Sequence, residues 1–318
     1  MMRVLLTVGL LILAWCGAAR AADDPRSLFR PQVRVEADPA AWYSAALFSP
    51  MPKPEPGDWM EAHPEPALSF GQYTASAPLR PRVARHTIYL SPLGTMAPKD
   101  RARMDVLREY MEVFYTLPAK FGPAASLEGV TSRDRPMFGR TVRQYLTSEI
   151  LDKTLPPLLP QDAFCLQAVT MEDLYPDPKW NYVFGQAMLD ARVGVYSLVR
   201  FYPAFWGQKE SEAAEQKGLR RSLATLVHEA GHMFGVWHCQ KYECVMNGSN
   251  SLSESDRRPI HLCPECLKKF RWNIGFDVVS RYEGLKAFYA SHGMAAEAAW
   301  VEKRLAECRA AGGAVKAQ

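Results

Sequence analysis

The sequence has little net charge, and this shortage excludes several classes of function. Its 318 residues include 38 lysines and arginines against 34 aspartates and glutamates, a formal net charge of +4. Two of the basic residues, Arg3 and Arg20, lie in a segment that we expect to be removed, which leaves 36 against 34, or +2. No run rich in lysine or arginine gathers this small excess in one place. The composition therefore excludes a dedicated nucleic-acid-binding protein and a polybasic membrane-surface protein.

The sequence also lacks an apolar run long enough to span a bilayer. Its N-terminal apolar segment, Val4–Trp15, has twelve residues, too few at 1.5 Å per residue for a hydrocarbon core of ~30 Å. A basic start, Met1–Arg3, precedes this segment, and the small residues of Ala19–Ala21 follow it. These three parts are typical of a signal peptide, so we predict that residues 1–21 are removed. The mature protein is then exported, periplasmic or extracellular, with no integral membrane association. The alternative is a buried N-terminal helix.

Residues 22–82 contain no cysteine, but they hold 11 of the 24 prolines. Proline removes a backbone donor and blocks helix interiors, so this stretch is predicted to be extended and irregular. It also carries aromatic residues that would be costly to expose, among them Trp42, Tyr43, Phe48, Trp59 and Phe70. We therefore predict that residues 22–84 form an arm packed on the following domain. The alternative is a pro-segment, which without a cysteine could not act through a cysteine switch.

Regular hydrophobic patterns begin at His86 and predict a mixed α/β fold. Apolar spacing predicts strands at 86–90, 163–171, 181–188 and 192–201, and helices at 99–115, 143–155 and 218–234. The last two strands are predicted to form an antiparallel hairpin. Two more helices, 278–289 and 294–311, are predicted to pair as a C-terminal helical hairpin within residues 276–318. The alternation favours a twisted mixed sheet packed on helices.

The predicted helix 218–234 carries His228 and His232 on the face opposite its apolar stripe. Residues at i and i+4 have Cβ atoms about 5–6 Å apart, which lets two imidazoles share one Zn²⁺. Glu229 is too close in sequence to the first ligand to complete the same tetrahedron, but it can accept a proton from metal-bound water. The motif continues to Gly235 and His238. Glycine permits the positive φ that ends the helix, so the chain can turn back and bring His238 to the third ligand position.

Six cysteines remain once the predicted signal peptide is removed, and four of them are clustered as a C-x₄-C and a C-x₂-C pair. These four are Cys239, Cys244, Cys263 and Cys266. Two such pairs can place four thiolates tetrahedrally around a zinc ion at about 2.3 Å, a closed site that stabilises a fold. The alternative is two disulfides, because an exported protein meets an oxidising compartment. Cys165 and Cys308 are predicted to be buried free thiols, since nothing in the sequence fixes the distance between them; the alternative is a disulfide that joins the two.

The combined motif resembles the archaemetzincins, a family of zinc metallopeptidases within the metzincin clan. Most metzincins carry an acidic residue after the third histidine, whereas here Cys239 follows and the pattern continues as H-C-x₄-C-x-M to Met246, then as C-P-E-C. Looser similarity includes residues 88–94 and 180–187, so the resemblance covers about 86–275. It implies a zincin-like catalytic domain at 85–275 that contains an active-site helix and a Cys₄ zinc element at 239–266.

The resemblance also implies a role for each motif residue. His228, His232 and His238 would hold the catalytic zinc, Glu229 would be the general base, and Met246 would lie beneath the three imidazoles as a hydrophobic floor. The four clustered cysteines would bind a second, structural zinc, which makes two Zn²⁺ per chain.

These observations predict an exported protease that hydrolyses peptide bonds in a peptide or protein substrate through a zinc-activated water. In metzincins the substrate lies antiparallel along an edge strand, and by sequence order that strand is 181–188. The alternative is a zinc-stabilised peptide-binding module with little or no turnover. Glu229 favours the enzyme, because a pure binder has no need of a base there. A purely structural protein with two zinc ions ranks last, since the open fourth position of the first site would be unused.

Overall fold

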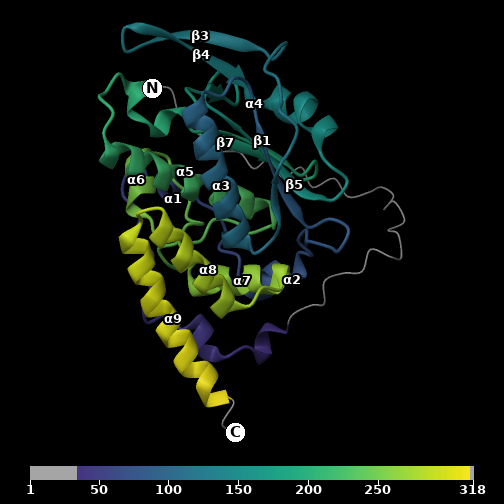
Figure 1. Ribbon diagram of the computed structural model, residues 1–318, viewed down its shortest axis with the longest axis vertical. Coiled ribbons are helices and arrows are strands. Elements are labelled where there is room, and N and C mark those ends of the chain that lie inside the picture. The colour runs from purple at the N-terminus through teal and green to yellow at the C-terminus, as the bar shows by residue number, and fades with distance from the viewer. Residues whose placement is uncertain (1–33, 316–318) are drawn as a thin grey trace.

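The computed structural model describes residues 34–315 and confirms the predicted mixed α/β fold class (Figure 1). The predicted signal peptide, residues 1–21, and the first part of the arm lie outside the described residues. A five-stranded sheet has the strand order β2-β1-β5-β8-β7. Its strands are β1 (Thr87–Pro92), β2 (Ala119–Phe121), β5 (Ala163–Thr170), β7 (Gly185–Met188) and β8 (Val193–Ser197).

Most neighbouring strands of this sheet are parallel, but β7 pairs antiparallel with β8, which confirms the predicted hairpin. Strand β5 is buried at every position, as expected for a central parallel strand that is covered on both faces. Strand β7 ends the sheet and is therefore an edge strand. The strand predicted at 181–188 is shorter than expected, since its first half contributes only an isolated bridge between Val183 and Leu174.

A second, three-stranded sheet shows where one sequence prediction is wrong. It has the order β3-β4-β6, formed by β3 (Ser132–Met137), β4 (Arg140–Leu146) and β6 (Asp173–Tyr175). The helix predicted at 143–155 therefore begins in a strand. Helix α4 (Thr147–Glu149) and a π-helical turn (Ile150–Thr154) follow β4, then a 3₁₀ turn at Pro156–Leu158. The apolar residues at the end of the strand and at the start of the helix have the spacing of one helical face, although they belong to two different elements.

Helices α3 (Pro98–Tyr115) and α5 (Glu212–Met233) pack against each other and against the larger sheet. The predicted apolar stripe of α5 is buried at Leu223, Leu226, Ala230 and Met233. The helix begins earlier than predicted, at a point where the Ser211 Oγ accepts a hydrogen bond from the Ala214 N–H at 3.2 Å. Such an N-cap satisfies one of the free amides of the first turn. Two 3₁₀ turns, Val199–Phe201 and Pro203–Trp206, connect β8 to α5.

The C-terminal part is helical, as predicted. It contains α6 (Leu252–Arg257), α7 (Pro264–Ile274), α8 (Val278–Ser291) and α9 (Ala295–Val315). Helices α8 and α9 form the expected hairpin, and α8 packs on α3. The buried Arg281 of α8 fixes this contact because its Nε donates to the Phe114 carbonyl oxygen of α3 at 2.7 Å. Within residues 34–315 no helix is both long and apolar enough to cross a bilayer.

The proline-rich arm packs along the domain in the described range 34–84. It contains 3₁₀ turns at Val35–Ala37 and Ala40–Tyr43 and two short helices, α1 (Trp59–Ala62) and α2 (Phe70–Ala75). Trp59 and Tyr73 are buried, and the Tyr73 hydroxyl donates to the Phe234 carbonyl oxygen at 2.8 Å. The arm is thus part of the packed structure.

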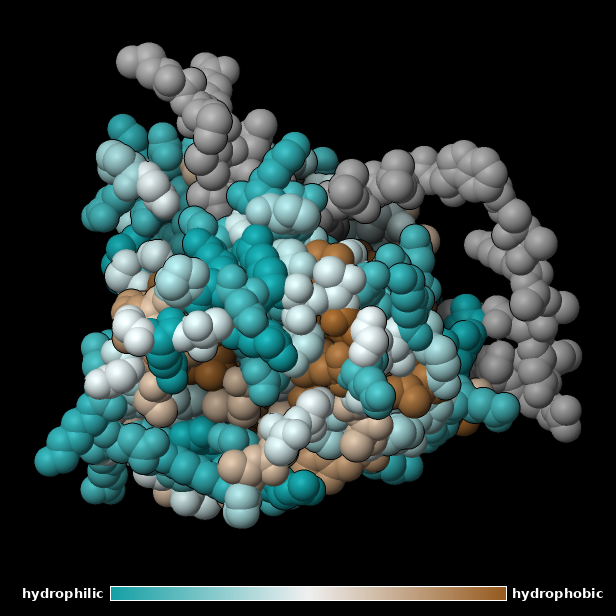
Figure 2. Space-filling view, turned by 90° about the horizontal axis from the view of Figure 1, so that it is seen from above, coloured by the Kyte–Doolittle hydropathy of each residue, from teal (hydrophilic) through white to brown (hydrophobic). Residues whose placement is uncertain are grey.

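The face seen from above is hydrophilic over most of its area, and its hydrophobic residues gather near the centre (Figure 2).

Candidate metal centre and cleft

Helix α5 presents two of the three motif histidines from adjacent turns. The Nε2 atoms of His228 and His232 lie 3.3 Å apart, and both rings are buried. Gly235 follows the helix at φ +73°, in the left-handed region that glycine adopts without strain. The chain turns there and brings back His238, whose ring centroid lies 5.2 Å from that of His228 and 5.0 Å from that of His232. The ligand atoms of all three lie within 4.8 Å of one another.

A separate acceptor holds each imidazole through its Nδ1 atom. The His228 Nδ1 is 2.7 Å from the Val245 carbonyl oxygen, and the His232 Nδ1 is 2.7 Å from the Val236 carbonyl oxygen. Such contacts fix the tautomer that carries hydrogen on Nδ1 and leave the lone pair of Nε2 for a metal ion. Two of the three motif histidines are therefore held in the form that ligates zinc.

The third histidine has an acceptor that the sequence did not suggest. The His238 Nδ1 lies 2.6 Å from the Oε1 atom of Glu65, a residue of the arm. The same oxygen accepts a hydrogen bond from the Trp59 Nε1 at 2.6 Å. Burial alone would raise the pKa of Glu65, but the hydrogen bonds from His238 and Trp59 outweigh it, so the pKa is lowered. The ring is therefore held by an ionised carboxylate.

Burial keeps the two helical histidines neutral. Desolvation lowers the pKa of His228 well below its usual value, and it lowers the pKa of His232 to about 3. The neighbouring imidazoles add to this shift, because two cations would repel at such short distances. Neutral imidazole is the form that binds a metal ion. The three-histidine site therefore fits a zinc ion in its donor atoms, its protonation state and its hydrogen bonding.

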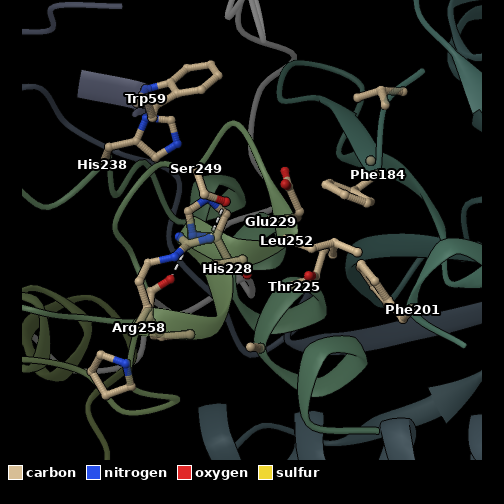
Figure 3. Close-up of a pocket in the computed structure, with 16 residues that line it drawn as sticks. Trp59, Phe184, Phe201, Thr225, His228, Glu229, His238, Ser249, Leu252 and Arg258 are labelled. Carbon is tan, nitrogen blue, oxygen red and sulfur yellow. Dashed lines mark hydrogen bonds between the residues drawn. The ribbon is translucent and has the colours of Figure 1, made fainter. Parts of the chain in front are cut away.

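Glu229 borders the same cleft next to His228 (Figure 3). Burial raises the pKa of Glu229 to about 7, and the nearby Arg258 guanidinium partly offsets that rise. A carboxyl group with a pKa near 7 is well matched to proton transfer at neutral pH. Because Glu229 lines the cleft, its carboxylate is available to a water or a substrate.

Met246 lies directly against the active-site helix and is fully buried. A Cβ atom at Gly231 would lie only 2.7 Å from the Met246 Sδ, so the glycine inside the H-E-x-x-H motif is needed for this close approach. The Met246 carbonyl oxygen accepts a hydrogen bond from the Cys239 N–H at 2.8 Å. The methionine thus links the three-histidine site to the adjacent cysteines.

The four clustered cysteines converge on one point. The Sγ atoms of Cys239, Cys244, Cys263 and Cys266 lie within 4.8 Å of one another, and all four residues are buried. The Cys239 and Cys263 sulfurs are 3.5 Å apart, whereas a disulfide bond measures about 2.05 Å. Backbone amides point at the sulfurs, as in the contact from the Cys266 N–H to the Cys263 Sγ at 3.4 Å. This arrangement fits a tetrahedral Cys₄ zinc site. Cys165 and Cys308 are buried elsewhere in the fold.

A cleft runs beside the histidines and includes Trp59, whose position at the site no sequence motif indicated. Figure 3 shows Trp59 and His238 on one side, Phe184 and Phe201 on the other, and His228 and Glu229 between them. Edge strand β7 borders the cleft through Gly185, so the chain places an unpaired strand edge beside the motif. Neither Trp59 nor Glu65 carried a motif, and each belongs to a stretch without periodicity.

Comparisons with known proteins find similarity to the archaemetzincins. The sequence profile of peptidase family M54 matches residues 162–272, which include both ligand clusters. The chain is 35% identical over 266 residues to archaemetzincin-2 of Rattus norvegicus, covering 75% of this chain and 74% of the relative. It is 34% identical over 271 residues to archaemetzincin-2 of Homo sapiens, with the same coverage of 75% and 74%. The crystal structure of archaemetzincin from Methanopyrus kandleri shares 27% identity at a TM-score of 0.46, covering 61% of this chain and 97% of that one.

Proposed function

The chain belongs to the archaemetzincin family of metallopeptidases, and on that premise we propose that it hydrolyses peptide bonds at a zinc ion held by His228, His232 and His238, with Glu229 as general base. The observation that supports this proposal is the way the three imidazoles are hydrogen-bonded and oriented. Each Nδ1 atom already has an oxygen partner within 2.7 Å, and the ligand atoms converge. A histidine cluster that served only packing would not need this common orientation.

The side chains of the cleft account for the steps of the reaction. A zinc ion at this site would supply a Lewis acid and lower the pKa of bound water to about 7. Glu229 takes the proton of the attacking water and passes it to the leaving amine nitrogen. The free edge of β7 offers backbone donors and acceptors to an extended peptide, which would hold the scissile bond next to Glu229.

Two further parts of the proposal concern the second metal and the compartment. We propose that Cys239, Cys244, Cys263 and Cys266 hold a structural zinc, so that the mature chain contains two zinc ions. The shared meeting point of the four sulfurs supports this stoichiometry. We also propose that the protein is exported after removal of residues 1–21, because the N-terminal sequence has the three parts of a signal peptide.

The substitution Glu229→Gln tests the enzymatic role. It removes the proton acceptor but no metal ligand and little volume, so kcat on a diverse peptide library should fall by about 10²–10⁴-fold. Zinc content and melting temperature should stay close to those of the unmodified protein. Glu212→Gln, an exposed change at the start of the same helix, is the matched control and should leave kcat unaltered. A Glu229→Gln variant that keeps more than about a tenth of kcat would refute the base assignment.

The same experiment separates the enzyme from a peptide-binding module. A binder with little turnover would retain peptides without cleaving them, and Glu229→Gln would then change nothing measurable by mass spectrometry. Cleavage products that appear with the unmodified protein and disappear with the variant favour the peptidase.

A further inference from the structure

The cleft beside the histidines contains a cation without a charged partner. Arg258 follows helix α6 and lines the cleft together with His228, Glu229 and Leu252 (Figure 3). Its Nη2 donates a hydrogen bond to the Ser249 Oγ. Its Nε is buried and has no hydrogen-bond partner among residues 34–315.

The acidic residues near Arg258 are committed to other groups. Glu254 lies one turn earlier, but its Oε1 accepts from the Trp59 N–H at 3.0 Å and its Oε2 accepts from the Asn250 N–H at 2.6 Å. Glu229, the other nearby carboxyl group, is the base proposed above. In the described part of the chain no carboxylate forms an ion pair with Arg258.

Neighbouring arginines form ion pairs with carboxylates, whereas Arg258 does not. Arg257 pairs with Asp58 at 2.6 Å, and Arg221 of α5 pairs with Asp256 at 2.6 Å. The contrast matters because desolvation of a guanidinium is costly without a hydrogen-bonded carboxylate, and here the longer-range attraction of Glu254 and Glu229 offsets only part of that cost. Burial lowers the pKa of Arg258 to about 10, which still leaves the side chain cationic at neutral pH. The cleft therefore keeps a permanent positive charge at its wall.

The size of the cleft limits what could neutralise this charge. Its cavity measures about 60 Å³, and its walls combine the apolar Phe184, Phe201 and Leu252 with the hydroxyls of Thr225 and Ser255. A water-sized group needs roughly 10–15 Å³ on the same measure, so the space accepts a few heavy atoms. A carboxylate fits this space, and guanidinium binds carboxylates through paired, charge-assisted hydrogen bonds.

We propose that Arg258 binds a carboxylate of the substrate, so that this peptidase prefers peptides with a negative charge next to the scissile bond. The inference rests on the proposed peptidase function and adds a substrate class to it: acidic peptides. Two groups can present the carboxylate, namely the side chain of aspartate or glutamate and the free C-terminus of a short peptide. Arg258 is then the residue that determines specificity.

Matched peptides test the inference. Sets of peptides carry Glu, Gln or Leu at each position that flanks the cleaved bond, each with a free or an amidated C-terminus. If an acidic side chain binds, the zinc-loaded full-length mature protein should cleave Glu peptides with a kcat/KM about tenfold or more above that of Gln peptides, since a charge-assisted hydrogen bond has at least that effect. If the free C-terminus is the carboxylate that binds, Glu, Gln and Leu peptides are cleaved alike and amidation lowers kcat/KM about tenfold or more; if the acidic side chain binds, the Glu preference persists after amidation.

Variants assign the preference to Arg258. In Arg258→Gln the observed ratio of kcat/KM, for Glu over Gln peptides or for free over amidated C-termini, should fall to about one even if the absolute rates change. Arg258→Lys should keep part of that ratio because it keeps the charge. Arg257→Gln changes the adjacent, exposed arginine and should keep the full ratio. Zinc content and melting temperature identify a variant that has failed to fold, in which case Arg258→Lys and the unmodified protein decide.

Two results would overturn the inference: an unmodified protein that prefers neither Glu over Gln peptides nor free over amidated C-termini, or an Arg258→Gln variant with an unaltered ratio. Binding of the same peptides to Glu229→Gln, followed by fluorescence anisotropy, separates this failure from failure of the peptidase proposal. If nothing is cleaved but acidic peptides still bind more tightly, the peptidase proposal fails and the Arg258 assignment stands. If peptides are cleaved at rates that do not depend on their charge, the peptidase proposal stands and the Arg258 assignment fails.

Discussion

Three acceptors from separate parts of the chain hold the three imidazole rings. Val236 and Val245 contribute carbonyl oxygens close to the motif, whereas Glu65 lies 173 residues before His238. The carboxylate is the strongest of these acceptors, because an ionised oxygen makes shorter and stronger hydrogen bonds than a carbonyl oxygen. Glu65 is therefore a positioning residue for the third ligand.

At this scale we predict that Glu65→Ala weakens zinc binding. Loss of an acceptor that orients a metal-bound histidine typically costs 10–100-fold in metal affinity, and we expect a change of about that size in competition with a chromogenic chelator. The zinc affinity of Glu65→Gln should lie between those of Glu65→Ala and the unmodified protein, since the glutamine amide oxygen can still accept a hydrogen bond from His238. Both measurements use zinc affinity, so they do not depend on activity.

The matched control for Glu65 is Glu61→Gln, an exposed change on the same arm whose carboxylate accepts a hydrogen bond from the Gly57 N–H. It should leave zinc affinity unaltered. If Glu65→Ala binds zinc as tightly as the unmodified protein, the carboxylate serves only to anchor the Trp59 indole.

At the scale of whole elements, the cysteine site joins the turn after α5 to helix α7. Cys263 is the N-cap of α7, where its Sγ accepts from the Cys266 N–H, and Cys239 lies just after the histidine motif. We predict that Cys263→Ser lowers the free energy of unfolding by several kcal/mol, within the ~5–15 kcal/mol of a whole domain, because the zinc loses one of four ligands. Serine is itself a favoured N-cap, so the helix start is preserved and the loss reports on the metal.

Denaturant titration and metal analysis check this prediction, with Cys308→Ser as control because that thiol is buried outside the cluster. The control should keep two zinc ions per chain, and Cys263→Ser should keep one. Two results together would contradict the Cys₄ zinc site. The unmodified protein would contain one zinc ion, and its mass under non-reducing conditions would be lower than that of the reduced chain by the four hydrogens that two disulfides lose.

Elements with a strong period could be predicted from sequence, and elements defined by distant contacts could not. Helices α3 and α5, strand β5 and the histidine motif each show their structure in local spacing. The error at 143–155 arose because Tyr145 and Leu146 belong to a strand while Ile150 and Leu151 belong to a helix, yet the four share helical spacing. Glu65 and Arg258 gave no local signal at all, since their roles depend on side chains from other parts of the chain.

For the molecule as a whole, the position of the described part of the arm, residues 34–84, bears on whether residues 22–84 are a permanent arm or a pro-segment. A pro-segment would cover the cleft and leave the mature site complete after removal. Here the arm instead provides Glu65 to His238 and Trp59 to the cleft wall, and a Cβ at Gly248 would lie 2.2 Å from the Trp59 ring. The domain surface is thus fitted to the arm, and removal would leave His238 without its carboxylate partner.

We therefore predict that the active, exported protein keeps the arm and begins at Ala22, the residue after the predicted signal peptide. Expression in a secreting host, followed by N-terminal sequencing and intact mass, checks this. Glu229→Gln is the control because it cannot process itself, so both proteins should share one N-terminus. An active protein that begins near Thr87, beside a Glu229→Gln variant that keeps the arm, would show that the arm is a self-removed pro-segment. Retention of Met1 in both proteins would contradict export. A shared start at Ala22 would make the arm a permanent part of the peptidase, because His238, the third zinc ligand, depends on the arm.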